Sequence, residues 1–331
     1  MTKARAVVFL APRSVELQEV ELPEVGEEEV FVTTSFSGIS GGTEMLAYRG
    51  EIDPHMPVDE VIDSLEGSFS YPFRYGYSCV GVVERSRSAL PEGTRVFAFH
   101  PHQDRFVAQA SDVVPLDDID PRTGTLFPLV ETALQVSLDA GPVRQEPVVV
   151  LGLGAVGLVT AALLRKSGAQ VLASDLKDWR RQAAAALNVL AVPPELLDER
   201  IMRDTEGRGV SLVVEATGNP KVLGPALSLL AHEGTALVAS WYGTKPVSLP
   251  LGGDFHRRRL VIRSSQVSTI PSRLAGRWTV ERRRAVTRSL LRELPLDALT
   301  THEFPFSEVS LAFEAVDRCD PGLIHAGLRY G

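Results

Sequence analysis

Residues 148–175 read VVVLGLGAVGLVTAALLRKSGAQVLASD, and this stretch decides the fold of the central part of the chain. A β-branched run ends in the pattern Gly152-x-Gly154-x-x-Gly157. An Ala/Leu-rich helix pattern follows, and after a turn a second apolar strand stops on Asp175. A strand, a glycine turn, a helix and a second strand in this order predict a parallel crossover that binds a dinucleotide.

The three glycines each have a physical reason in such a crossover. Gly152 allows the tight turn, Gly154 lets backbone N–H groups approach a pyrophosphate, and Gly157 lets the helix pack closely against the strand. The pyrophosphate then lies at a helix N-terminus, where unpaired N–H groups favour an anion. The predicted phosphate-binding loop consists of Gly152, Leu153, Gly154, Ala155, Val156 and Gly157.

Asp175 predicts which coenzyme is bound. A carboxylate at the end of the second strand can accept hydrogen bonds from both hydroxyls of the adenosine ribose, and its charge would repel a 2′-phosphate. NAD is therefore predicted in preference to NADP, although Arg180 and Arg181 leave an opening for NADP. Further coenzyme contacts are expected where later strands end, at Thr217, Gly218, Ser240 and Trp241. The alternative is a doubly wound domain that binds no nucleotide.

The composition is typical of a globular protein with more than one domain. The chain has 331 residues, of which 44% are hydrophobic and 23% charged, and a formal net charge of −8. The negative charge argues against a nucleic-acid surface, and no apolar run reaches membrane-spanning length. Two cysteines, Cys79 and Cys319, make a disulfide framework improbable. These features predict a protein of the reducing cytoplasm that acts on a small molecule, without a nucleic-acid or membrane partner.

The pattern of strands and helices divides the chain into two predicted domains. Residues 1–118 contain short alternating strands separated by turns, which indicates a β-rich barrel or sandwich. Residues 119–264 alternate between strands and helices and predict a doubly wound parallel sheet. Residues 265–331 are expected to return to the first domain. Between Glu44 and Tyr77 lies a long irregular stretch that is either a lid over a pocket or a surface excursion.

The chain resembles the medium-chain dehydrogenase/reductase superfamily, which includes zinc alcohol dehydrogenases and quinone reductases. The matching pieces are SGIS at 37–40, GYSCVGVV at 76–83, the glycine loop, VEATG at 214–218 and SSQ at 264–266. Within the superfamily, GISGGTE followed by YRG is similar to the bacteriochlorophyllide dehydrogenase-like branch. The resemblance implies an α/β protein with a GroES-like catalytic domain, a Rossmann coenzyme domain, a pocket between them, and a homodimer.

The positions that would hold a catalytic zinc are unusual. The resemblance implies a cysteine, a histidine and a further cysteine or glutamate, and the corresponding residues here are Ser40, Tyr77 and Glu131. A zinc site needs about three ligands drawn from thiolate, imidazole and carboxylate, and only Glu131 qualifies. We therefore expect no zinc. The alternative is a different site built from Glu44, His55, His100, His102 and Glu131.

Without a metal, a side chain must exchange the proton of the substrate oxygen. The resemblance places six residues around the pocket: Ser40, Thr43, Glu44, Tyr77, Ser78 and Glu131. Tyr77 is the first choice as proton donor, provided that its neighbours lower its pKa; the alternative is that it only fills the volume of a lost ligand.

The other acid–base candidates also have two interpretations each. Glu131 either orients the donor or acts as a base, or it is a carboxylate in the first turn of its helix, stabilised by the helix dipole. Thr43 and Glu44 either face the ligand or stabilise a turn. His102 is a second candidate acid or base.

The sequence as a whole predicts a zinc-independent oxidoreductase that transfers a hydride between NAD(H) and an alcohol or carbonyl substrate. One alternative is an NAD(P)H-dependent reductase of an activated C=C bond or a quinone. Another is a coenzyme-binding redox sensor without turnover. No cluster of charges in the sequence identifies the substrate.

Overall fold

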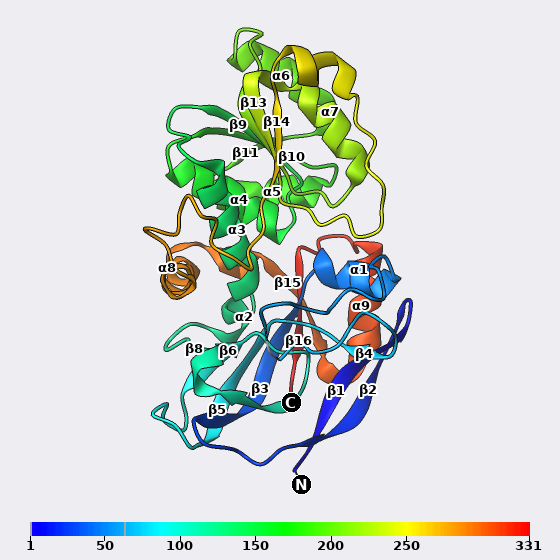
Figure 1. Cartoon of the computed structure of the whole chain (residues 1–331), viewed down its shortest axis with the longest axis vertical. Helices are drawn as coiled ribbons and strands as arrows, with labels where there is room; N and C mark the ends of the chain where they lie inside the picture. Colours follow the sequence, from blue (N-terminus) through cyan, green and yellow to red (C-terminus); the bar gives the residue numbers. More distant parts are fainter. Residues whose placement is uncertain (1, 63) are drawn as a thin grey trace. The chain divides into compact units, whose positions relative to one another are not determined.

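The computed structural model describes residues 2–62 and 64–331. The chain forms two compact units, which we call the first unit (Met1–Pro128 with Arg284–Gly331) and the second unit (Leu129–Arg283). In Figure 1 the second unit contains the green and yellow elements, and the first unit the blue, cyan and red ones.

The second unit is built on a six-stranded sheet in the order β11-β10-β9-β12-β13-β14. All five strand pairs are parallel. The strands are β9 (Pro147–Leu151), β10 (Gln170–Ser174), β11 (Leu190–Val192), β12 (Val210–Glu215), β13 (Leu230–Val238) and β14 (Val261–Ser264). The helices are α3 (Phe127–Ala140), α4 (Ala155–Lys166), α5 (Asp178–Ala186), α6 (Leu197–Asp204) and α7 (Leu223–Ser228).

The central strand β9 shows why this sheet forms. Val148, Val149 and Val150 are all almost completely buried, so both faces of the strand are covered, as parallel sheets require. The chain leaves β9 toward β10 on one side and returns with β12 on the other. A crevice at such a reversal of strand order is where doubly wound sheets bind their ligands. The predicted doubly wound fold is confirmed.

The first unit contains two sheets. A three-stranded sheet has the order β2-β1-β4, and a seven-stranded sheet has the order β15-β16-β3-β5-β6-β8 with β7 paired to β3. The strands are β1 (Thr2–Ala11), β2 (Ser14–Leu22), β3 (Glu29–Ile39), β4 (Phe73–Arg74), β5 (Cys79–Ser86), β6 (Arg95–Ala98), β7 (Arg105–Gln109), β8 (Val113–Pro115), β15 (Thr300–Pro305) and β16 (His325–Arg329). The helices α1 (Thr43–Arg49), α2 (Pro121–Gly124) and α9 (Val309–Arg318) accompany them, and α8 (Val280–Glu293) crosses the boundary between the units. The predicted GroES-like β-rich fold is confirmed.

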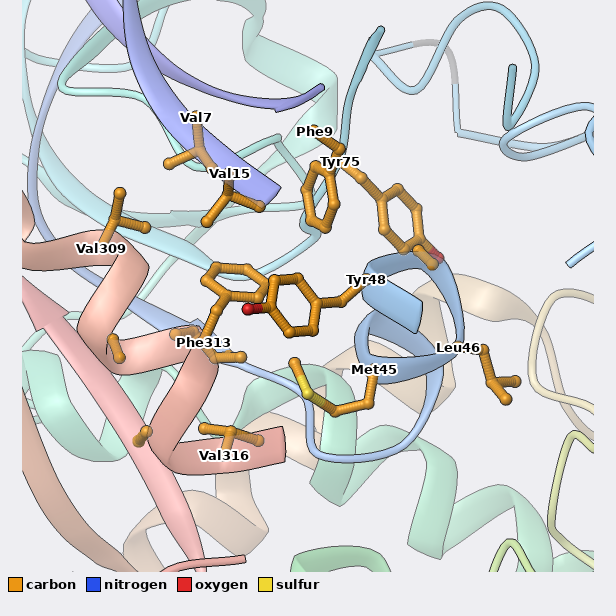
Figure 2. Packing of buried hydrophobic residues seen from close by; sticks show 14 of the residues in the cluster. Val7, Phe9, Val15, Met45, Leu46, Tyr48, Tyr75, Val309, Phe313 and Val316 are labelled. Atoms are coloured by element: carbon orange, nitrogen blue, oxygen red, sulfur yellow. The ribbon is translucent and has the colours of Figure 1, made fainter. Parts of the chain in front are cut away.

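An aromatic core joins the small sheet of the first unit to its helices. The ring of Phe313 in α9 meets Phe9 of β1 edge-on at 5.3 Å and Tyr48 of α1 at 5.4 Å. Figure 2 shows these rings pointing toward one another. Ile52 and Phe69 of the irregular stretch are buried in the same cluster. This stretch is therefore anchored in the core of the first unit by its own apolar side chains.

The C-terminal run returns to the N-terminal part of the chain as predicted, because Gly327 of β16 pairs with Gly38 of β3. In the second unit, α7 ends at Ser228, and Leu230 already pairs with Val210 in the sheet. Among the residues that the structure describes, no helix is both long enough and apolar enough to cross a membrane.

The first boundary between the units lies later than residue 118, where the first predicted domain ends. The chain stays in the first unit through α2 and up to Pro128. Phe127 at the start of α3 stacks on Phe97 of β6, with ring centroids 4.5 Å apart. This apolar contact keeps the first residues of α3 in the β-rich unit.

The second boundary also lies later than predicted, at Arg283 instead of residue 264. Two residues beyond 264 bind Asp139 near the end of α3. The hydroxyl of Ser265 donates to Asp139 Oδ2 at 2.7 Å, and Arg273 Nη2 lies 2.6 Å from Asp139 Oδ1. These polar contacts hold the segment after β14 in the second unit.

Candidate functional site

The glycine loop after β9 requires glycine at two positions. Gly152 has φ +91°, and a side-chain carbon there would lie 2.7 Å from the carbonyl oxygen of Ala216. A side-chain carbon at Gly157 would lie 1.9 Å from the carbonyl oxygen of Gly152. At Gly154 the same carbon would meet no described atom within 4 Å, so the backbone there is open to a ligand. These positions match the roles that the sequence predicts for the three glycines.

Helix α4 begins directly at this loop. Its N-cap is Gly154, which has no side chain of its own to cap the helix. The first N–H groups of a helix have no carbonyl partner within the helix, and they carry its positive dipole end. Ala155, Val156 and Gly157 therefore offer N–H donors for an anionic group such as a pyrophosphate.

Asp175 follows β10 and is bonded to the glycine loop itself. Its Oδ2 accepts the N–H of Leu153 at 2.7 Å, and its Oδ1 accepts the N–H of Lys177 at 2.8 Å. Asp175 is 8% exposed, and Arg180 Nη1 lies 3.6 Å from Oδ2. Arg181 donates instead to the backbone carbonyl of Asp175, at 2.7 Å. The carboxylate of Asp175 is therefore hydrogen-bonded directly to the predicted phosphate-binding loop.

The loops after β12 and β13 contain the other predicted coenzyme residues. The N–H of Gly218 donates to Ser240 Oγ at 2.8 Å, so the two loops are in contact. Trp241 is 39% exposed. Thr217 binds Glu215, a fully buried carboxylate at the end of β12 that the sequence analysis did not single out. The signal was a charged residue directly after the apolar run Leu212-Val213-Val214.

A second polar cluster lies in the first unit, around Glu44 and His102. His102 Nε2 is 2.8 Å from Glu44 Oε2, and His102 Nδ1 is 2.8 Å from the hydroxyl of Ser37. The other carboxylate oxygen of Glu44 accepts the N–H of Ser40 at 2.9 Å. Ser37 in turn bonds the hydroxyl of Tyr330 at 2.9 Å. Ser37 and Tyr330 were not predicted as part of this cluster, because they lie far apart in the chain and meet only in the folded structure.

Tyr77 lies beside this cluster, and its hydroxyl is bonded to Ser40 and Thr43. Burial first, and then the charge of Glu44, raise the pKa of Tyr77 well above 10 despite these two hydrogen bonds. The expectation that its neighbours lower this pKa is wrong in direction. A phenol with a raised pKa stays protonated at neutral pH, and it remains able to donate a proton or a hydrogen bond.

Gly76 makes room for the histidine of this cluster. It has φ +121°, and a side-chain carbon there would lie 2.6 Å from Cδ2 of His102. Ser78, also expected near the pocket, donates its hydroxyl to the carbonyl of Thr125 at 2.6 Å. The structure thus brings together Ser40, Thr43, Glu44, Tyr77 and His102.

Glu131 occupies a different environment, in the second unit. Its Oε1 lies 3.0 Å from Arg283 Nε, and the two side chains are 4% and 3% exposed. Arg283 Nη1 also donates to Gln135 Oε1 at 2.8 Å, one turn further along α3. Glu131 is not in the first turn of α3, which begins at Phe127, so that alternative is wrong. The carboxylate is one half of a buried ion pair.

The donor groups at the expected zinc positions do not fit the metal. Ser40 and Tyr77 offer hydroxyls that hydrogen-bond one another, and the raised pKa of Tyr77 disfavours the phenolate. Glu131 is neutralised by Arg283. Within 2–62 and 64–331, no three or more His, Cys, Asp and Glu side chains are grouped as a metal site, so the alternative set of Glu44, His55, His100, His102 and Glu131 is not assembled there.

The chain is similar to known dehydrogenases over almost its whole length. Residues 155–279 match the family model described as zinc-binding dehydrogenase. L-galactonate-5-dehydrogenase of Escherichia coli (strain K12) is 23% identical, over 95% of each chain. The 2-desacetyl-2-hydroxyethyl bacteriochlorophyllide A dehydrogenase of Cereibacter sphaeroides is 27% identical, over 94% of this chain and 93% of the relative.

These matches agree with the resemblance to the medium-chain dehydrogenase/reductase superfamily. An alcohol dehydrogenase from Thermotoga maritima has the same fold as this chain, with a TM-score of 0.81, 18% identity and complete coverage of both chains. A dehydrogenase from Escherichia coli CFT073, solved in complex with NADH, has a TM-score of 0.78 and 17% identity, over 99% of this chain and all of that one. The predicted resemblance and the predicted fold are confirmed, and the named relatives are oxidoreductases.

Proposed function

We propose that this protein is a medium-chain dehydrogenase that transfers a hydride between NAD(H) and an alcohol or carbonyl substrate without a catalytic zinc. The observation that carries the proposal is the bonding of Asp175 to the glycine loop. A carboxylate at the end of β10, held by the N–H of Leu153, lies where a ribose is expected once a pyrophosphate occupies the start of α4.

The residues around this loop suit NAD better than NADP. Asp175 adds a negative charge, which disfavours a 2′-phosphate. Arg180, which could otherwise neutralise such a phosphate, is already 3.6 Å from Asp175. Leu176 is 80% exposed directly after this carboxylate, and offers an apolar surface for a flat ring such as adenine. When bound, the nicotinamide group supplies the hydride chemistry, and the protein supplies orientation and electrostatics.

The first-unit cluster supplies the proton chemistry in this proposal. Tyr77 is the proton donor, because its hydroxyl is protonated at neutral pH and hydrogen bonds with Ser40 and Thr43 orient it. Glu44 and His102 hold the loop that carries these two hydroxyls, since Glu44 accepts the N–H of Ser40. Zinc independence is supported by the hydroxyls of Ser40 and Tyr77, which replace better zinc ligands.

The names of the relatives favour an alcohol/carbonyl pair as the substrate. They are dehydrogenases of galactonate, of threonine and of a hydroxyethyl bacteriochlorophyllide, each a compound with a hydroxyl group. Reduction of an activated C=C bond or a quinone is the alternative activity. It would be favoured by a preference for NADPH, which the negative charge of Asp175 opposes.

The test is a titration with NADH and NADPH, followed by a screen of grouped carbonyl substrates with both coenzymes. We expect tight binding of NADH, weaker binding of NADPH, and stoichiometric NADH consumption with at least one carbonyl class. Coenzyme binding without consumption of any carbonyl, alkene or quinone would favour a redox sensor instead. Stoichiometric zinc in the freshly purified protein, with loss of activity after chelation, would refute zinc independence.

Two further properties are proposed from weaker support. Cys79 and Cys319 are both free thiols, which agrees with a reducing compartment such as the cytoplasm. A homodimer is proposed from the family resemblance, with a small molecule as the substrate and no nucleic-acid or membrane partner. Sedimentation analysis of the purified protein tests the dimer directly.

A further inference from the structure

Glu215 is buried at the carboxyl end of β12. The two residues before it, Val213 and Val214, are fully buried, and Glu215 itself has no exposed surface. Burying a carboxylate is unfavourable unless hydrogen bonds or charges compensate it. A glutamate in this position therefore needs strong local partners.

These partners come from the two loops at the same edge of the sheet. Oε1 of Glu215 accepts the N–H of Thr217 at 2.7 Å and also binds the Thr217 hydroxyl. Oε2 accepts the hydroxyl of Tyr242 at 2.6 Å. Thr217 follows β12 and Tyr242 follows β13, so one carboxylate ties together the loops that leave two neighbouring strands.

The tied loops lie directly against the glycine turn. The backbone of Ala216, between Glu215 and Thr217, lies close to Gly152. A side-chain carbon at Gly152 would be only 2.7 Å from the carbonyl carbon of Ala216. The N–H of Ala216 donates to the carbonyl of Leu151 at 2.8 Å, just before the turn. A shift of the Thr217 loop would therefore change the shape of the turn.

The bond between Tyr242 and Glu215 is also persistent. Burial and the Glu215 carboxylate raise the pKa of Tyr242, so its hydroxyl stays a donor throughout the neutral range. A hydrogen bond from a neutral donor to a charged acceptor is stronger than one between neutral groups. The two loops are thus held by a bond that does not switch with pH near neutrality.

We propose that Glu215 and Tyr242 are positioning residues for the coenzyme: they hold the loops after β12 and β13 against the glycine turn and thereby raise coenzyme affinity without contacting the coenzyme. This inference rests on the proposed binding of NAD(H) at that turn. If the pair is broken, the loops spend only part of the time in the binding conformation, and the apparent affinity falls by that fraction.

The experiment compares Tyr242→Phe with a matched control, Tyr71→Phe. Both substitutions remove one hydroxyl that donates at 2.6 Å, from Tyr242 to Glu215 and from Tyr71 to the carbonyl of Ala47 in the first unit. NADH dissociation constants are measured by fluorescence well below the unfolding temperature. We expect Tyr242→Phe to raise the constant about tenfold and Tyr71→Phe to change it less than about twofold.

A second variant, Glu215→Gln, keeps an oxygen that can accept from Thr217 and an amide that can bond the Tyr242 hydroxyl. We expect it to bind NADH more tightly than Glu215→Ala. Equal NADH binding by wild type and Tyr242→Phe would overturn the inference, as would equal weakening in both tyrosine variants. Failure of the wild type itself to bind NADH or NADPH would instead overturn the proposed function.

Discussion

The buried ion pair between Glu131 and Arg283 gives a prediction that separates a structural from a catalytic role. In Arg283→Met, the carboxylate of Glu131 loses the guanidinium that lies 3.0 Å away, while both sites stay closed to water at 4% and 3% exposure. Breaking a buried pair in this way costs about 3–5 kcal/mol. We expect the lower end, about 3 kcal/mol, because Glu131 can escape part of this cost by taking up a proton.

The double variant Glu131→Leu/Arg283→Met removes both charges at once. Replacing a buried pair by apolar side chains of similar volume is often nearly neutral. Gln135 loses the donor at 2.8 Å from its Oε1, which costs about 1 kcal/mol. The same loss is already contained in the cost of about 3 kcal/mol for Arg283→Met, so the double variant should keep a cost of about 1 kcal/mol and be about 2 kcal/mol more stable than the single one.

The assay is urea unfolding followed by tryptophan fluorescence. All three tryptophans, Trp179, Trp241 and Trp278, belong to the second unit, so the signal reports the unit that contains the pair. With a slope of about 2 kcal/mol per molar, a loss of about 3 kcal/mol lowers the urea midpoint by about 1.5 M.

The control is Arg200→Met, which breaks a more exposed ion pair with Asp204 in the same unit. It should cost no more than about 0.5 kcal/mol. A loss below about 1 kcal/mol in Arg283→Met would refute the reasoning. So would a double variant no more stable than the single one. Turnover decides the role of Glu131: activity that returns with stability in the double variant means that Glu131 is not an acid or base.

Three other predictions test the coenzyme site, the cluster and the interior of the first unit. Asp175→Ser should raise the ratio of NADP affinity to NAD affinity at least about tenfold. The ratio is measured because loss of the bond to Leu153 weakens the binding of both coenzymes. An unchanged ratio refutes the role of Asp175 in coenzyme choice. Tyr77→Phe should slow the chemical step in single-turnover kinetics and leave NADH affinity intact, whereas a wild-type rate rules Tyr77 out as the donor. Burial lowers the pKa of His325 from 6.5 to about 4, so the unfolded chain takes up a proton there before the folded protein does. This difference corresponds to about 3 kcal/mol in the free energy of unfolding, which is fully present above pH 6.5 and is lost as the pH falls toward 4. His325→Gln should flatten the pH dependence of urea unfolding in that window, and the exposed His55→Gln should not; equal slopes in all three proteins contradict the assignment.

The coenzyme half of the molecule was predictable because its signals are local. The glycine spacing, the apolar run of β9 and the acidic end of β10 all lie within 148–175, and each follows from steric or electrostatic needs of a single crossover. The φ of +91° at Gly152 and its close approach to Ala216 explain why the pattern requires glycine at this position.

The contacts of the catalytic candidates were not predictable in the same way. Glu44 and His102 are 58 positions apart, and Glu131 and Arg283 are 152 apart, so no spacing in the sequence brings them together. Only the strand pairing and the packing of α8 do so. The pKa of Tyr77 also depends on burial, which outweighs the hydrogen bonds of its hydroxyl with Ser40 and Thr43.

The pairing of Glu44 with His102 explains how a buried carboxylate persists beside Tyr77 without needing a cation from outside the chain. A carboxylate without exposed surface requires a compensating partner, and the imidazole at 2.8 Å and the N–H of Ser40 provide it. The same carboxylate raises the pKa of Tyr77, which makes the phenol a weaker acid. Neutralising Glu44 should therefore do two opposite things, since it lowers the pKa of Tyr77 toward its ordinary value and also loosens the loop that orients Tyr77. Because only the first effect depends on charge, Glu44→Gln, which can still accept the N–H of Ser40, should preserve more of the activity than Glu44→Ala.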